Sequence, residues 1–246
     1  MSEPIRLSVA APAYNEAEGI EAVVTDWHSF LSACDDVSEF EIVICNDGAT
    51  DRTGDILDRL TLPVPQLRPL HFAQNQGAAA ALNHAIASTH GDWVLLLDSD
   101  GQFPIANLPD MLAAVRRTNA KAAIGIRQKK DVPFARFGSW ASGLVCNIVH
   151  GANMRDFNSA FKLVWGPTLR GLGLEAKGMN YSTEVTSRLL ERGITPVEVT
   201  ITHRPRITGV SSMKLVRGAI HRLLFVLYIA LRQLLLKLGI LTRPQA

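Results

Sequence analysis

The chain has 246 residues, of which 47% are hydrophobic and 20% are charged. This length suits one large domain with a small appendage, and the composition excludes an intrinsically disordered chain. The formal net charge of +2 gives no reason to expect a nucleic acid as a partner.

The cysteines and the N-terminal residues bear on the cellular compartment. Cys34, Cys45 and Cys146 lie in apolar stretches, without the close pairing of a disulfide framework or the spacing of a metal site. We therefore expect buried thiols in a reducing compartment. Residues 1–10 show no apolar stretch behind a basic leader, which argues against secretion. These features predict a cytoplasmic protein.

Strand-like and helix-like segments alternate through the first half of the chain. In chain order we expect a strand at 5–14, a helix after Asn15, a strand at 40–47, a short helix at 51–60, a weaker strand at 67–72, an alanine-rich helix at 77–89, a strand at 92–100, a helix from Pro104 to about 117, and a strand at 121–127. Asn15 is expected to cap the first helix. Continuously apolar strands separated by helices predict an α/β fold, with a mainly parallel central sheet and helices on both faces.

Polar side chains follow three of these strands. They are Tyr14, Asn15 and Glu16 after the first strand, Asn46 and Asp47 after the second, and Asp98 and Asp100 after the fourth. A single acidic strand end is more often a helix cap or a solvated turn. Because ligands of parallel sheets bind beyond the carboxyl ends of the strands, three such ends together indicate a binding site.

The acidic turn at 98–102 suits a divalent metal. Asp98 and Asp100 are separated by one residue, so both carboxylates can face one point, and Gln102 could add a neutral oxygen. Hard oxygen ligands of this kind suit Mg²⁺ or Mn²⁺ carrying a diphosphate, on which the metal would act as a Lewis acid. Neither glycine-rich phosphate-binding motif is present in the sequence.

The C-terminal segment is unusually apolar. Residues 223–231 form an uninterrupted apolar run, but Arg222 and Arg232 flank it, so it falls short of the roughly 20 apolar residues that a bilayer span needs. The segment predicts an apolar, amphipathic helix that lies on an anionic membrane surface. The alternative is a helix packed on the domain or on a second subunit, as in a homodimer.

Four segments in order resemble the motifs of the family 2 glycosyltransferases with the GT-A fold. They are PAYNE at 12–16, CNDGATDRT at 45–53, NQGAAAAL at 75–82 and DSDGQ at 98–102. The extended form DSDGQFP is similar to that of the polyprenyl-phosphate (dolichyl-phosphate) sugar transferases, and segments at 124–127, 155–163, 181–199 and 204–212 follow that subgroup in order and spacing. The resemblance covers about residues 5–216. It implies a Rossmann-like GT-A catalytic domain at 1–216, followed by the apolar helical segment at 217–246.

The resemblance also implies which residues bind the nucleotide sugar. The implied donor-binding residues are Pro12, Tyr14, Glu16, Asn46, Asp47, Asp98, Ser159, Glu184, Arg206 and Ser211. Among them, Glu16 and Asp47 would contact the base or ribose. Asp100 and Gln102 would coordinate Mg²⁺ or Mn²⁺ on the diphosphate.

The implied catalytic residues are Asp100, Asp156, Arg127 and Arg136. Arg127 and Arg136 would grip the acceptor phosphate, and Asp156 would lie beside the sugar. Because a phosphate is already ionised at neutral pH, a general base is not obligatory, and no proton-removing role is assigned to Asp156 or Glu184. The family implies inverting transfer by direct displacement.

Three positions depart from the family pattern. Asn46 stands where an aspartate is usual, Ala160 replaces a glycine, and Ser212 replaces a common lysine. These changes bear on the base contact, on the approach of the backbone to the sugar, and on the phosphate grip of the loop.

Other residues receive plainer interpretations. Arg188, Glu191 and Arg192 are expected on a solvated helix face. Trp27 and Phe161 are expected in the core. The remaining set consists of histidines without ligand-like spacing, which we interpret as ordinary polar or core residues: His71, His84, His90 and His150.

Three hypotheses for function follow. The first is a metal-dependent transferase that moves one sugar from a nucleotide sugar, of the GDP-mannose or UDP-hexose type, to a polyprenyl phosphate at the cytoplasmic face of the membrane. The second is a family 2 transferase that acts on a hydroxyl of a glycan or protein. The third is a nucleotide-sugar-binding module without catalysis.

Overall fold

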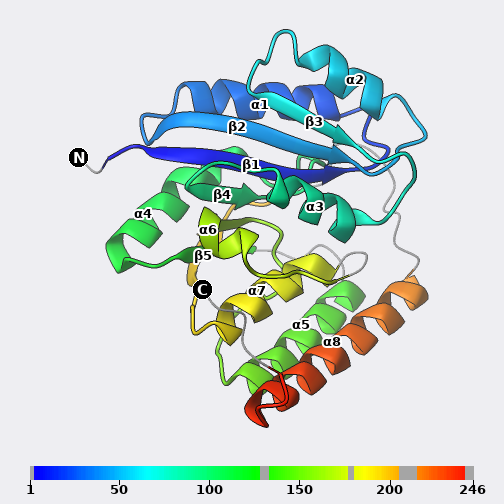
Figure 1. Cartoon of the computed structure of the whole chain (residues 1–246), viewed down its shortest axis with the longest axis vertical. Coiled ribbons are helices and arrows are strands. Elements are labelled where there is room, and N and C mark those ends of the chain that lie inside the picture. The colour runs from blue at the N-terminus through cyan, green and yellow to red at the C-terminus, as the bar shows by residue number, and fades with distance from the viewer. Residues whose placement is uncertain (1–2, 128–132, 177–179, 205–214, 242–246) are drawn as a thin grey trace.

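The computed structural model describes residues 3–127, 133–176, 180–204 and 215–241, with the side chains of 133–140 and 215–222 excepted. Seven strands in these residues form one sheet in the order β3-β2-β1-β4-β6-β5-β7 (Figure 1). The strands are β1 (Ile5–Ala13), β2 (Val37–Asn46), β3 (Leu67–His71), β4 (Trp93–Leu96), β5 (Ala122–Arg127), β6 (Lys162–Trp165) and β7 (Val197–Ile201). The predicted α/β architecture with a mainly parallel sheet is confirmed.

Helices cover both faces of the sheet. They are α1 (Ile20–Ser32), α2 (Thr53–Leu60), α3 (Ala78–Ala87), the short 3₁₀ helix η1 (Ile105–Asn107), α4 (Leu108–Thr118), α5 (Pro133–His150), α6 (Gly166–Arg170), α7 (Tyr181–Glu191) and α8 (Leu215–Lys237). One core cluster joins α1, α2 and α4 to one face, and a second joins α3, α6 and α7 to the other. The alternation of side chains along a strand explains this division, since Val9 belongs to the first cluster and Ala10 to the second.

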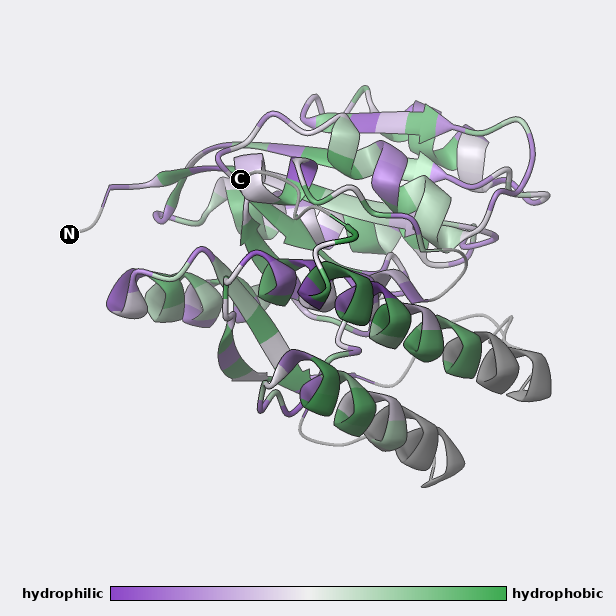
Figure 2. Cartoon of the chain, turned by 60° about the horizontal axis from the view of Figure 1, so that its bottom comes forward, coloured by the Kyte–Doolittle hydropathy of each residue, from purple (hydrophilic) through white to green (hydrophobic). Residues whose placement is uncertain are grey.

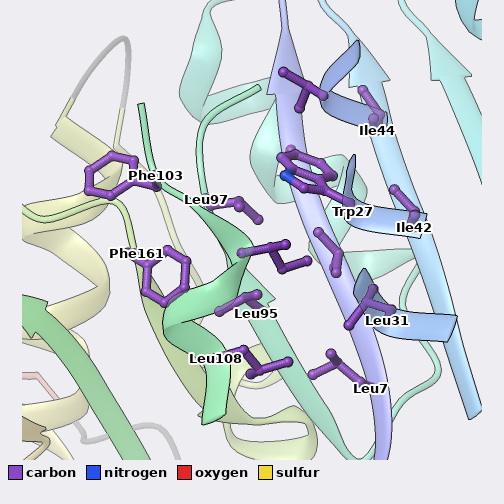
Figure 3. Packing of buried hydrophobic residues seen from close by; sticks show 14 of the residues in the cluster. Leu7, Trp27, Leu31, Ile42, Ile44, Leu95, Leu97, Phe103, Leu108 and Phe161 are labelled. Atoms are coloured by element: carbon purple, nitrogen blue, oxygen red, sulfur yellow. The ribbon is translucent and has the colours of Figure 1, made fainter. Parts of the chain in front are cut away.

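The first cluster contains the aromatic residues that were expected in the core. Trp27 is 1% exposed and Phe161 is fully buried. Figure 3 shows Trp27 and Leu31 of α1 beside Ile42 and Ile44 of β2, within one continuous apolar layer. These contacts hold α1 against the strands, so the loop between β1 and α1 starts from a fixed frame.

The direction of the strands places several chain segments at one edge of the sheet. β1 pairs in parallel with β2 and β4, whereas β6 runs antiparallel to both β4 and β5. The carboxyl ends of β1, β2, β4 and β5 therefore lie at the same edge as the amino end of β6. This geometry gathers the polar residues that follow the strands, as the sequence predicts.

The prediction that Asn15 caps the first helix is wrong. α1 begins at Ile20, after Gly19, and no side-chain hydrogen bond caps it. Asn15 has a positive φ of 55°, and its Oδ1 accepts the backbone N–H of Thr50 at 2.8 Å. The side chain therefore joins the loop after β1 to the loop after β2, which sequence spacing alone could not indicate.

The predicted solvated face of α7 is also wrong for two of its three residues. Arg188 and Glu191 are each 3% exposed, whereas Arg192 is partly exposed. Arg188 pairs with Glu184 at 3.1 Å, and Glu191 accepts from Arg232 of α8 at 3.2 Å. The prediction fails because α8 covers this face of α7.

Helices α5 and α8 lie side by side below the sheet and present an apolar surface, which Figure 2 shows in green. On the inner side, Val226 and Ile229 of α8 pack with Phe157 in a third core cluster. The exposed hydrophobic residues of the two helices and the turn after α8 are Leu144, Val145, Ile148, Leu223, Leu224, Leu227, Leu231, Leu234, Leu238 and Ile240. We call these residues the α5/α8 apolar surface. Within the described residues, no helix has both the length and the apolarity needed to cross a bilayer.

Candidate functional site

The ends of β1, β2 and β4 are joined by backbone hydrogen bonds and by a serine. The N–H of Asp47 donates to the carbonyl of Ala13 at 2.8 Å, and Ser99 Oγ donates to the carbonyl of Pro12, also at 2.8 Å. Beside this junction Tyr14 is 37% exposed and Glu16 is 9% exposed. The structure therefore brings the predicted nucleotide-binding segments together at one edge.

Asp47 is bound tightly by the loop before α3. Its carboxylate accepts from the backbone N–H groups of Gln76 at 2.7 Å and Gly77 at 2.9 Å, and from Asn75 Nδ2 at 3.0 Å. Burial raises the pKa of this carboxyl, against the lowering effect of the backbone donors. Asp47 thus fixes two loops at the candidate nucleotide site, a role that its position after a strand did not reveal.

The acidic turn after β4 is held by a buried tyrosine. The hydroxyl of Tyr181, at the start of α7, donates to Asp98 Oδ1. Burial and the charge of Asp98 raise the pKa of Tyr181 well above its ordinary value, so the hydroxyl remains a proton donor. Asp100 Oδ1 accepts the N–H of Gln102 at 3.0 Å, and the carbonyl of Gln102 accepts from the N–H of Arg204 at 2.8 Å. The turn therefore has a defined conformation.

The oxygen donors of this turn fit Mg²⁺ or Mn²⁺. Asp100 and Gln102 are partly exposed and offer carboxylate and amide oxygens. Such metals are commonly held by one or two carboxylates, with phosphate oxygens and water completing the shell. The described residues contain no group of three His, Cys, Asp or Glu side chains that could hold a metal by themselves. The donor set therefore suits a metal that is shared with a bound diphosphate.

Arg127, the last residue of β5, forms a two-pronged ion pair with Asp156. Arg127 Nε lies 2.9 Å from Asp156 Oδ2, and one terminal nitrogen lies 3.1 Å from Oδ1. Asp156 is 1% exposed in its side chain, whereas Arg127 is 20% exposed. The guanidinium therefore has a fixed plane and keeps part of its surface accessible.

Lys162 is a buried cation that the sequence interpretation missed. It begins β6, opposite Leu96 of β4 and Ile124 of β5, and it is 1% exposed. Its Nζ donates to the carbonyl of Ser159 and lies 3.5 Å from that of Phe157. Burial lowers the pKa of Lys162 to about 7, and the charges of Asp156 and Asp98 oppose this effect. The sequence feature that could have indicated Lys162 is a charged residue in an otherwise apolar strand.

Two of the predicted donor-binding residues, Ser159 and Glu184, are buried. Ser159 is fully buried, and its Oγ has no hydrogen-bond partner in the described part of the chain. Glu184 is 1% exposed, and its carboxylate accepts the N–H of Ala176 at 2.7 Å and that of Glu175 at 2.9 Å. Glu184 therefore holds the chain before α7, in addition to pairing with Arg188.

Three predicted residues lie where side chains are not described. Arg136 is in the first part of α5, whose backbone alone is described, and Arg206 and Ser211 fall outside the described residues. Their roles stay predictions.

Comparison with known proteins agrees with this geometry. The sequence profile of Glycosyl transferase family 2 matches residues 8–161. Glycosyltransferase AglD of Haloferax volcanii is 28% identical over 229 residues, which are 87% of this chain and 35% of that protein. An undecaprenyl-phosphate mannosyltransferase of Micrococcus luteus is 28% identical over 221 residues, which are 85% of this chain and 88% of that protein. The match thus spans about a third of the first relative and most of the second.

Solved structures show the same fold. A mannosyltransferase of Pyrobaculum calidifontis, in complex with GDP-Man and Mn²⁺, aligns with a TM-score of 0.68 at 18% identity, over 94% of this chain and 65% of that one. Glucosyl-3-phosphoglycerate synthase of Mycobacterium tuberculosis, in complex with phosphoglyceric acid, aligns with a TM-score of 0.65 at 20% identity, over 93% of this chain and 80% of that one. These likenesses confirm the predicted fold.

Proposed function

The chain belongs to glycosyl transferase family 2 and is a glycosyltransferase, and from this premise we propose that it transfers one sugar from a nucleotide sugar to a polyprenyl phosphate at a membrane surface. The observation that carries the choice of acceptor is the α5/α8 apolar surface beside the site. Phe157 follows Asp156 directly, and it packs in the same cluster as Val226 and Ile229 of α8. A lipid held along these helices would have its phosphate close to Arg127. The named function of the undecaprenyl-phosphate relative supports the same choice.

The donor would bind at the ends of β1, β2 and β4. Tyr14, Glu16 and the Asp47 turn form the nucleotide end of this site. Asp100 and Gln102 would hold Mg²⁺ or Mn²⁺ against the diphosphate. When bound, the metal supplies Lewis-acid stabilisation of the negative charge on the leaving diphosphate. The Mn²⁺ complex of the Pyrobaculum structure supports this assignment.

The arginine beside the site suits an ionised acceptor. Arg127 presents a planar guanidinium, which matches a phosphate in geometry and charge, and Asp156 fixes its plane. A phosphate oxygen would attack the anomeric carbon from the face opposite to the nucleotide. The new bond joins that carbon to the acceptor phosphate, the bond to the diphosphate breaks, and the configuration inverts. No proton has to be removed from the acceptor, so Asp156 orients rather than deprotonates.

The surface that would meet the membrane is apolar and has a basic residue at one end. The α5/α8 apolar surface includes Leu227, Leu231 and Leu234 at helical spacing, and Lys237 ends α8. A helix of this kind buries its apolar side at the lipid boundary and is attracted to anionic headgroups. This supports a peripheral association with the face of the membrane that displays the acceptor phosphate.

An acceptor comparison tests the proposal. The purified protein is offered a panel of GDP and UDP sugars with Mg²⁺ or Mn²⁺, and with three acceptors: a polyprenyl phosphate, the corresponding polyprenol without phosphate, and a soluble oligosaccharide. We expect product from the first acceptor alone, because Arg127 has no anion to bind in the others. Product from the oligosaccharide would move the acceptor to a glycan hydroxyl. Nucleotide-sugar binding without turnover on any acceptor would indicate a binding module.

A further inference from the structure

Asn46, the last residue of β2, is joined to the outside of the sheet by a chain of side-chain hydrogen bonds. Its Oδ1 accepts the backbone N–H of Ala49 at 3.0 Å. Its Nδ2 lies 3.2 Å from Nδ1 of His71, the last residue of β3. The other ring nitrogen, Nε2, lies 3.0 Å from Oδ1 of Asp58 on α2. Asn46 is 6% exposed, so its amide is committed to partners within the protein.

These contacts have one self-consistent direction. The backbone N–H of Ala49 can only donate, so it fixes the oxygen of the Asn46 amide and turns the NH₂ group toward His71. Nδ1 of His71 must then accept, which leaves the ring proton on Nε2, where the Asp58 carboxylate accepts it. A reversed amide would place Asn46 Oδ1 against the accepting Nδ1 of His71, and Asn46 Nδ2 against the N–H of Ala49, so that neither contact could be a hydrogen bond. Asp58 therefore selects the tautomer of His71, and His71 selects the orientation of Asn46.

The Asn46 amide is bonded to the turn that carries Asp47, because it accepts the N–H of Ala49. Gly48 in this turn has a φ of +63°, and a Cβ placed there would lie 2.4 Å from the carbonyl carbon of Gln74. The turn is thus pressed against the loop whose N–H groups bind the Asp47 carboxylate. One side of the turn is held by that loop, and the other is held through the Asn46 amide.

We propose that His71 and Asp58 are positioning residues for the nucleotide end of the donor site, which they hold in its binding conformation through Asn46 without touching the ligand. The inference rests on the proposed function, since it takes the Asp47 turn to be part of the donor site. It assigns to His71 a role that its isolated place in the sequence did not indicate. It also explains why an amide serves at position 46, because a carboxylate there would lack the NH₂ group that His71 accepts.

The test measures donor affinity in variants that leave the core intact. Asp58 and His71 have side-chain exposures of 64% and 36%, so His71→Ala and Asp58→Ala should fold normally. Binding of UDP and GDP to the protein with Mn²⁺ is measured by calorimetry, together with KM for the donor, kcat, and the thermal midpoint. Asp55→Ala is the matched control, because Asp55 is an exposed acid on the same helix.

We expect His71→Ala to weaken nucleotide binding and raise the donor KM roughly 3- to 10-fold, the range that loss of one ordering hydrogen bond gives. Its kcat and thermal midpoint should stay close to those of the parent. Asp58→Ala should act in the same direction by a smaller factor, and it should add nothing in the His71→Ala background, because the chain of bonds is already broken. Asp55→Ala should bind like the parent.

Three results would overturn the inference, and the first two distinguish its failure from that of the proposed function. If the parent protein binds the nucleotides and both variants bind them equally well, then His71 has no positioning role although the donor site stands. If the parent binds neither nucleotide, the donor site of the proposed function is wrong and the inference fails with it. Independent, additive effects of the two variants would also contradict it.

Discussion

Replacement of Arg188 by alanine tests the buried charge network that joins α7 to its surroundings. The side chain is 3% exposed and lies 3.1 Å from Glu184, 3.5 Å from Glu191 and 3.1 Å from Glu175. Glu184 and Glu191 are each 2% exposed in their side chains, so removal of the cation leaves two carboxylates buried. Breaking a buried pair in this way costs about 3–5 kcal/mol. For a chain of this length, that loss lowers the thermal midpoint by roughly 6–20 °C.

The matched control is Arg59→Ala. Arg59 pairs with Glu21 at 2.7 Å, but both side chains are more than half exposed, so its loss should cost about 0–1 kcal/mol. Urea denaturation followed by circular dichroism gives the free energy of unfolding of both variants. Equal stabilities for Arg188→Ala and Arg59→Ala would refute the assignment of a buried network.

Three further predictions concern the site and helix α8. Burial lowers the pKa of Lys162 to about 7, so between about pH 7 and 10 the unfolded chain binds a proton that the folded chain has lost, and stability rises with pH in that window. Relative to Lys162→Met, the free energy of unfolding of the parent should increase by roughly 1 kcal/mol per pH unit in urea titrations between pH 7 and 9. A stability difference between the two proteins that does not change with pH would contradict this. Tyr181→Phe removes the donor to Asp98 and should lower kcat/KM about tenfold or more with little change in stability, whereas unchanged kinetics would exclude a role for this bond. Leu227→Lys with Leu231→Lys should abolish flotation with anionic liposomes at an unchanged thermal midpoint, and continued flotation would show that another surface binds the membrane.

The two leucine substitutions in α8 test membrane contact more specifically than removal of residues 218–246 would. Val226 and Ile229 of α8 are buried, and Arg232 pairs with the buried Glu191. Deletion would therefore expose core residues and leave Glu191 without Arg232, so that loss of fold could not be separated from loss of membrane contact.

The sequence predicts well which polar residues lie at the edge of the sheet, because each of them directly follows its own strand in the chain. Each apolar run ends in polar residues, and parallel strands bring those ends together, so Asp47, Asp98 and Asp100 were correctly expected at one edge. The antiparallel strand β6 was not expected, since its short run at 162–165 follows a long segment with no strand-like period. That omission also hid Lys162.

Contacts between distant segments account for the other failures. The charged residues of α7 look like a solvated face, because their true partner, Arg232, is 41 residues away from Glu191 in the chain. In the same way, Asp47 is bound by a loop about 30 residues further on, which no motif spacing could indicate. The periodicity of the sequence cannot predict hydrogen bonds and ion pairs between side chains that are far apart in the chain.

The measurement that tests the central claim most directly is mass spectrometry of the lipid product. The purified protein is incubated with Mg²⁺ or Mn²⁺, a polyprenyl phosphate and a panel of GDP and UDP sugars, with EDTA and with Asp100→Ala as parallel controls. We expect a lipid whose mass increases by one sugar residue and which is absent in both controls. A lipid that stays unmodified with every donor, while the sugar appears on a glycan or protein added to the reaction, would contradict the account.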